Sequence, residues 1–313
     1  MVPKNIFQTH KSLDYIKSNK LLLNAQNTWK ENKSFNYYFY DDLECDKFMS
    51  DFFPDIKHIY DKLPLKVMKA DLWRYCIIFK YGGIYADSDT AILVNPNFLI
   101  INNKNLIVVP ENNTHFCQWV FAAPPNSPIL KSVIDLSVER IENIKEFKGE
   151  HIVHYLTGPG VFTDGILRYL RLPIRKYDHI NLNYLDHNFI PLKYGKEGGI
   201  LDYESNFNEI KIGNSNTNTK IISLNKKYPS NTEITFVHNY SDTFKYTIKD
   251  NNLYITRTDK NSGWGQDLIG YINSMDDMFV FKSEIFHKKW IKHLFSGGWS
   301  NGWCKERELL IKS

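Results

Sequence analysis

The sequence is poor in the features that define several large classes of protein. Only four cysteines occur among 313 residues, and their wide spacing argues against zinc ribbons, redox pairs and a disulfide framework: Cys45, Cys76, Cys117 and Cys304. No apolar run approaches the roughly 18 residues that span a bilayer. The first residues also lack the apolar core of a signal peptide. We therefore expect a folded protein of a reducing, cytoplasmic compartment without a transmembrane segment.

An excess of one charge is also missing. The chain has 39 basic and 35 acidic residues, a net charge of +4, and these residues do not form long runs. This distribution excludes a nucleic-acid binder that relies on bulk electrostatics. The composition that is present, 42% hydrophobic and 24% charged, is that of a globular protein with a buried core. At roughly 150 residues per domain, the length fits one large or two modest domains.

The order of apolar patterns predicts an α/β fold. Residues 3–10 are expected to form a first strand, residues 12–33 a helix and residues 35–42 a second strand. The same patterns predict further helices at 65–81 and 127–145, and further strands at 83–89, 105–110 and 119–123. Gly82 stands where a helix C-cap needs a left-handed residue. Strands that alternate with helices in this way indicate a sheet covered by helices.

The texture of the sequence changes after residue 200. Residues 200–262 are rich in Asn, Ser and Thr and include a hairpin pattern that turns at Asp250 to Asn252. Residues 282–313 have a helical pattern interrupted by a Gly- and Trp-rich stretch. We therefore predict one domain over 1–245, and a C-terminal hairpin and helical extension over 246–313 that packs on it.

Two pairs of charged residues lie close together in the stretch KADLWRYCIIFKYGGIYADSDT. Asp71 and Arg74 are one helical turn apart and should project from one helix face. Asp87 and Asp89 are two residues apart, so in a strand their carboxylates point the same way. Neighbouring carboxylates suit Mg²⁺ or Mn²⁺, which keep open positions for phosphate oxygens. A solvated turn or a helix cap is the alternative interpretation of this acid pair.

Five stretches in this order resemble retaining glycosyltransferases of family 32, the initiation-mannosyltransferase type with a DxD motif and a GT-A fold. They are VPKNIFQTHKS, FYDD, KADLWRYCIIFKYGGIYADSDT, FCQWVFAAPPNSP and TGPGVFTDGI, and they cover roughly residues 2–170. The resemblance extends to the catalytic domains of clostridial glucosylating toxins. It implies a Rossmann-like mixed sheet flanked by helices, with an appended C-terminal helical segment. Residues 1–245 would then be the catalytic domain that binds a nucleotide sugar.

The resemblance also implies roles for the two charged pairs. Asp89 would ligate the divalent cation, Mn²⁺ or Mg²⁺, and Asp87 would contact the ribose or hold a metal-bound water. Asp71 and Arg74 would bind hydroxyls of the donor sugar. A surface ion pair is the alternative for Asp71 and Arg74, and it would contribute only about 0.2 to 0.5 kcal/mol.

Further residues are assigned by the same resemblance. Thr9 would line the nucleotide cleft at the carboxyl end of the first strand, where open α/β sheets bind ligands. Gln118 would present its amide near the reacting carbon, unless it is a buried structural residue. A late histidine would complete the metal site, either His238, which we favour because it follows a strand-like run, or His293, which lies in a helical pattern and would reach the diphosphate together with Trp299.

The implied activity is metal-dependent transfer of a hexose, with retention, from a UDP- or GDP-sugar to a glycan or protein hydroxyl. Peripheral association with a membrane stays open. Asp87 to Thr90, DSDT, also resemble the DxDxT of a class of phosphohydrolases, with Asp276 and Asp277 as a second acid pair. That alternative gives no use to Asp71 or Arg74. A catalytically silent sugar-binding protein of the same fold is a further alternative.

Overall fold

The computed structural model describes residues 1–109, 111, 115–149, 151–169 and 290–294, together with six further strands. The helices are α1 (Leu13–Ser18), α2 (Lys20–Lys30), α3 (Asp42–Phe52), α4 (Pro54–Asp61), α5 (Lys66–Tyr81), α6 (Pro128–Asn143), α7 (Ile152–Leu156) and α8 (Pro159–Tyr169), with a 3₁₀ helix, η1, at Pro96–Leu99. The strands up to α6 are β1 (Asn5–Thr9), β2 (Asn36–Tyr40), β3 (Gly83–Ala86), β4 (Thr90–Ile92), β5 (Leu106–Val108) and β6 (Val120–Ala123). The later strands are β7 (Glu209–Asn214), β8 (Thr217–Ser223), β9 (Thr232–Val237), β10 (Thr243–Lys249), β11 (Asn252–Arg257), β12 (Met278–Val280) and β13 (Ile291–His293).

A mixed six-stranded sheet organises the molecule, and its strand order is β12-β5-β6-β3-β1-β2. Strand β1 runs parallel to β2 and β3, and β12 runs parallel to β5. Strand β6 runs antiparallel to both of its neighbours, β3 and β5. The carboxyl ends of β1 and β3 therefore lie at the same edge as the start of β6. This mixed sheet with flanking helices confirms the predicted α/β class and is consistent with a GT-A fold.

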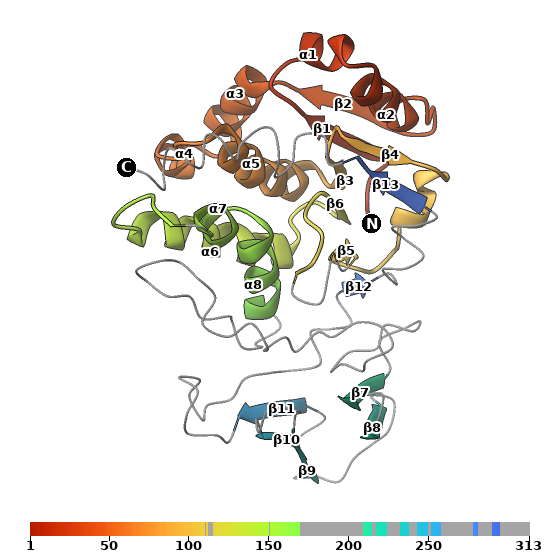
Figure 1. Ribbon diagram of the computed structural model, residues 1–313, viewed down its shortest axis with the longest axis vertical. Helices are drawn as coiled ribbons and strands as arrows, with labels where there is room; N and C mark the ends of the chain where they lie inside the picture. The colour runs from red at the N-terminus through yellow and green to blue at the C-terminus, as the bar shows by residue number, and fades with distance from the viewer. Residues whose placement is uncertain are drawn as a thin grey trace.

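Alternating side chains of the central strands build two cores, one on each face of the sheet. Phe7, Tyr85 and Phe121 pack with apolar residues of α3 to α8 on one face. Ile6 and Ile84, their immediate neighbours in sequence, pack on the other face with residues of α2, β4 and β13. Figure 1 shows α5 to α8 on one side of the sheet and β4 with β13 on the other. Because successive side chains of a strand point to opposite faces, the same strands contribute to a core on each face of the sheet.

Two consecutive glycines connect α5 to β3. Gly82 caps α5 with φ +64°, as the sequence predicts, and a Cβ there would lie 2.5 Å from the Pro125 ring. Gly83 has φ +122°, and a Cβ there would lie 2.6 Å from the carbonyl oxygen of Asn5 on β1. Side chains are excluded at both positions by conformation and by space. The glycines allow α5 to turn directly into the centre of the sheet.

The predicted helix over 12–33 is wrong in one respect, because it consists of two helices. Asn19 adopts an extended conformation that ends α1. Its side chain then accepts hydrogen bonds from the backbone N–H groups of Leu21 and Leu22, at 3.0 and 3.3 Å, and so caps α2. An asparagine that competes for backbone donors in this way favours a new helix start over continuation.

Two further predictions need correction. The strand predicted over 83–89 ends at Ala86, so Asp87 and Asp89 lie in a turn between β3 and β4. His293 lies in β13, which pairs antiparallel with β4, and not in a helix, because the backbone around it is bound to the edge of β4. Apart from residues 290–294, the stretch 282–313 lies outside the described residues.

The predicted hairpin is confirmed, since β10 and β11 pair antiparallel with Lys249 opposite Asn252. The domain boundary near residue 245 stays a prediction, and it falls within β10. Each helix of the described chain is too short or too polar to cross a membrane.

Candidate active site

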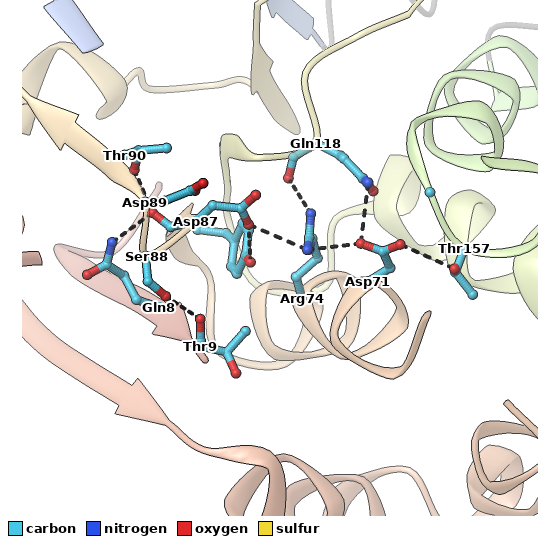
Figure 2. Close-up of polar contacts among 12 residues, drawn as sticks. Gln8, Thr9, Asp71, Arg74, Asp87, Ser88, Asp89, Thr90, Gln118 and Thr157 are labelled. Carbon is cyan, nitrogen blue, oxygen red and sulfur yellow. Dashed lines mark hydrogen bonds and ion pairs between the residues drawn. The ribbon is translucent and has the colours of Figure 1, made fainter. Parts of the chain in front are cut away.

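The turn from Asp87 to Thr90 is held by hydrogen bonds to its backbone. The Asp87 N–H donates to the carbonyl of Trp119, at the start of β6, over 2.8 Å. The Asp87 carbonyl accepts from the Gln8 amide at 3.1 Å, and from the Thr90 N–H and hydroxyl at 3.0 and 2.6 Å. The Ser88 hydroxyl donates to the Thr9 carbonyl (Figure 2). Strands β1 and β6 therefore fix the backbone that carries the two aspartates.

Asp87, Asp89 and His293 come together at this turn. Each offers one ligand atom, and these three atoms lie within 4.8 Å of one another. The Nε2 atom of His293 lies 3.6 Å from Oδ1 of Asp89. The pairing of β13 with β4 brings the histidine there, and the Leu294 N–H donates to the Asp89 carbonyl at 2.9 Å. Among the residues described, this is the one such group that could hold a metal ion.

The donor set fits a divalent cation such as Mn²⁺ or Mg²⁺. Two carboxylates and an imidazole supply hard oxygen and nitrogen ligands, with room for further ligands from water or phosphate. The side chains of Asp87, Asp89 and His293 are 25%, 14% and 12% exposed, so they are accessible without lying in bulk solvent. His238, which the sequence ranked above His293, lies outside the described residues, as does Trp299.

Arg74 lies between the buried Asp71 and the partly exposed Asp87. Its Nη2 is 2.9 Å from Oδ1 of Asp71 and 3.4 Å from Oδ1 of Asp87 (Figure 2). Asp71 and Arg74 are 1% and 5% exposed, so this pair is not an ion pair on the helix surface. Burial raises the pKa of Asp71 to about 7, although Arg74 opposes the shift. The pKa of Asp87 is also raised, mainly by burial and further by Asp89, while Arg74 again opposes it.

Gln118 is bound to the buried acid. Its amide nitrogen donates to Asp71 at 3.3 Å, and its amide oxygen accepts from the Tyr75 hydroxyl. The Thr157 hydroxyl donates to the second carboxylate oxygen of Asp71 at 3.3 Å. Thr157 is also the C-cap residue of α7, so this threonine both ends a helix and contacts the site. Asp71 is therefore held by Arg74 on α5, by Gln118 before β6 and by Thr157 at the end of α7.

Sequence reasoning missed Tyr75 and Tyr85. The Tyr85 hydroxyl donates to Oδ1 of Asp87 at 2.5 Å, and the Arg74 guanidinium lies 4.7 Å from the centre of the Tyr85 ring. Tyr85 stands two residues before Asp87, so strand alternation could have placed it on the same face. Tyr75 follows Arg74 directly on α5, and no spacing pattern connects it to Gln118.

Thr9 lies beside the turn at the end of β1. Its hydroxyl donates to the Tyr40 carbonyl at 2.8 Å, and its own carbonyl accepts from Ser88. Thr9 also lines a small pocket between β1 and helices α3 to α5, together with Asp42, Cys45, Asp46, Tyr60, Lys66, Lys69 and Ala70.

Comparison with known proteins finds relatives over the part of the chain that carries these acids. Residues 5–106 match the glycosyltransferase sugar-binding region containing a DXD motif. The predicted resemblance to DXD-motif glycosyltransferases is therefore confirmed. The chain is 30% identical over 205 residues to the initiation-specific α-1,6-mannosyltransferase of Candida albicans, covering 54% of this chain and 53% of that protein. It is 28% identical over 218 residues to the protein of the same name from Schizosaccharomyces pombe, covering 60% and 54%.

The chain thus spans about half the length of these two relatives. Among solved structures, the PaToxG glycosyltransferase is 20% identical, with a TM-score of 0.40 over 53% of this chain and 68% of that chain. The matched sugar-binding region contains Asp71, Arg74 and the DXD motif, Asp87 to Asp89. Gln118 and His293 lie beyond it, so the fold brings Gln118 to Asp71 and His293 to the motif from later parts of the chain.

Proposed function

We propose that this protein is a metal-dependent retaining glycosyltransferase that moves a hexose from a UDP- or GDP-sugar to a hydroxyl of a glycan or other acceptor. The observation that carries the proposal is the meeting of Asp87, Asp89 and His293 beside the buried Asp71 and Arg74 pair. The match to a glycosyltransferase sugar-binding region and the mannosyltransferase names of the relatives support it.

Asp89 and His293 would hold the cation, Mn²⁺ or Mg²⁺, and Asp87 would hold a metal-bound water or contact the ribose. When bound, the cation supplies positive charge that stabilises the diphosphate as it leaves the sugar. The carboxylates need no large rearrangement for this task, because the turn that carries them is already fixed by its backbone hydrogen bonds.

Asp71 and Arg74 would bind hydroxyls of the donor sugar. The contacts of Gln118 and Thr157 fix the orientation of the Asp71 carboxylate, and Tyr85 does the same for Asp87. Burial around these groups excludes water from a site where a sugar–phosphate bond is broken, and preorganised polar groups act more strongly there than in water. Retention follows from the family resemblance, and no nucleophile is assigned.

The phosphohydrolase alternative is less favoured. It requires Asp87 as a free nucleophile, whereas the Asp87 carboxylate lies against Tyr85 and Arg74. Its second acid pair, Asp276 and Asp277, lies outside the described residues. The catalytically silent alternative is also less favoured, because the buried charged pair and the DXD motif are both intact.

We further propose a reducing, cytoplasmic compartment, a glycan or protein hydroxyl as acceptor, and no nucleic-acid partner. The cysteines support the choice of compartment, because Cys45 and Cys76 are buried and form no disulfide within the described part of the chain.

A screen of UDP- and GDP-sugars, with and without Mn²⁺, tests the proposal. We expect Mn²⁺-dependent release of a nucleoside diphosphate from at least one donor. Turnover of a simple phosphomonoester without any response to nucleotide sugars would instead support the phosphohydrolase.

A further inference from the structure

A short chain of hydrogen bonds, the relay, connects Tyr37 on the edge strand β2 to the turn from Asp87 to Thr90, the DXD turn. Tyr37 on β2 donates its hydroxyl proton to the Gln8 amide oxygen at 2.8 Å. Gln8, near the end of β1, donates its amide nitrogen to the carbonyl oxygen of Asp87 at 3.1 Å (Figure 2). Gln8 is fully buried, at 0% exposed. In the parallel pair, Tyr37 stands opposite Ile6, which is two residues before Gln8 and on the same face.

The two partners of the Gln8 amide agree on which way it points. The Asp87 carbonyl can only accept, so the amide nitrogen of Gln8 faces the turn and the amide oxygen faces Tyr37. Burial raises the pKa of the Tyr37 phenol well above its ordinary value, so the hydroxyl keeps the proton that it donates to this oxygen. Without the phenol, the buried amide oxygen would lose its donor, and the amide could rotate away from Asp87.

The Asp87 carbonyl accepts the hydrogen bonds that hold the turn in place. It accepts from Thr90 on one side and from Gln8 on the other. Rotation of this peptide group would move Asp87 and, through Ser88, change the separation of the two carboxylates. The relay therefore acts on the geometry of the metal ligands without contacting their side chains. Groups that hydrogen-bond directly to a metal ligand typically change metal affinity about 10- to 100-fold, so we expect the lower end of this range for Tyr37, which acts through Gln8.

We infer that Tyr37, acting through Gln8, is a positioning residue for the DXD turn. This inference rests on the proposed function, in which the turn holds a divalent cation. It assigns a role to the edge strand β2, which contributes no group to the cation site itself.

The test is a titration of the metal-free protein with Mn²⁺, in which electron paramagnetic resonance measures the free ion. We expect Tyr37→Phe to bind Mn²⁺ about tenfold more weakly than the wild type. The matched control is Tyr38→Phe, which removes the same hydroxyl from the next residue of β2. The Tyr38 ring stacks on Phe7, with centroids 5.1 Å apart, on the other face of the sheet. We expect this control to bind Mn²⁺ like the wild type.

A double-mutant cycle separates a relay from two independent effects. Gln8→Met should weaken Mn²⁺ binding at least as much as Tyr37→Phe, and the double variant should be no weaker than Gln8→Met alone. Near-ultraviolet circular dichroism checks that each variant is folded, and Tyr37→Phe alone decides the matter if Gln8→Met does not fold. Wild-type affinity in Tyr37→Phe, or additive losses in the double variant, would overturn the inference and leave the proposed function intact. A wild-type protein that binds no Mn²⁺ would overturn both.

Discussion

His293 lies 3.6 Å from Asp89, measured from Nε2 to Oδ1, although the two residues come from distant parts of the chain. The antiparallel pairing of β13 with β4 creates this contact and places His293 opposite Thr90. A cation at the DXD motif would therefore be held by an early turn and a late strand together.

Asp89→Ala should abolish Mn²⁺-dependent turnover of nucleotide sugars and leave the fold intact. The substitution removes a candidate ligand, and the carbonyl of residue 89 can still accept from Leu294. Release of nucleoside diphosphate measures the turnover, and circular dichroism measures the fold. Asp14→Ala is the control, since the Asp14 side chain is 95% exposed on α1. Full activity in Asp89→Ala would refute the assignment of the metal site.

His293→Ala should weaken Mn²⁺ binding, because it removes the imidazole from the three-ligand group. The loss of affinity should reach or exceed the roughly 10- to 100-fold that is typical when a group that only hydrogen-bonds to a metal ligand is removed. Titration of the metal-free protein gives the affinity directly. His238→Ala is the informative comparison, because the sequence favoured that residue. A larger loss in His238→Ala than in His293→Ala would reverse the choice between the two histidines.

Asp71→Asn should change how stability depends on pH. The folded protein raises the pKa of Asp71 from 3.8 to about 7, so the folded state binds the proton more tightly than the unfolded state. The contribution of Asp71 to stability is then complete below about pH 4 and is lost as the pH rises through about 7. The variant cannot ionise at this position.

We therefore expect the wild type to lose free energy of unfolding relative to Asp71→Asn between pH 5 and pH 8. The change should amount to a few kcal/mol, at about 1.4 kcal/mol per pKa unit. Denaturant unfolding at both pH values measures it, with Asp135→Asn on the exposed face of α6 as the control. An equal difference between wild type and Asp71→Asn at both pH values would contradict the raised pKa.

Gly83→Ala should destabilise the fold. The residue has φ +122°, and the added Cβ would approach the Asn5 carbonyl oxygen to 2.6 Å. Backbone strain of this kind costs on the order of 1–3 kcal/mol, and the contact with β1 adds to it. Thermal and denaturant unfolding give the loss. An alanine variant as stable as the wild type would show that β1 and β3 can separate at this point without cost.

Much of the fold could be predicted from the sequence, because it follows from local patterns. The helix α5, the glycine at its end and the helix α6 opened by Ser127 all have strong local signals. The closeness of Asp71 to Arg74 also follows from helix geometry. Their burial could not be predicted, since Gln118, before β6, and Thr157, at the end of α7, reach Asp71 only in the folded chain.

Other features of the site depend on long-range contacts. The spacing of apolar residues around His293 is typical of a helix, yet the edge of β4 supplies hydrogen bonds that favour a strand. Strand alternation gave the right expectation that Asp87 and Asp89 lie together, but for the wrong reason, because these residues are in a turn held by Gln8, Thr90 and Trp119. Strand alternation could have placed Tyr85 beside Asp87, whereas no sequence signal distinguishes Tyr75 from the many core aromatics.

The reversed direction of β6 carries the chain back to the two charged pairs. The chain enters β6 through residues 115–119 at the same edge where it leaves β1 and β3. Gln118 in this entering segment donates to Asp71, and the carbonyl of Trp119 accepts from the Asp87 N–H. A change in the length of this segment would therefore disturb the sugar-binding pair and the DXD motif together, although neither lies within it.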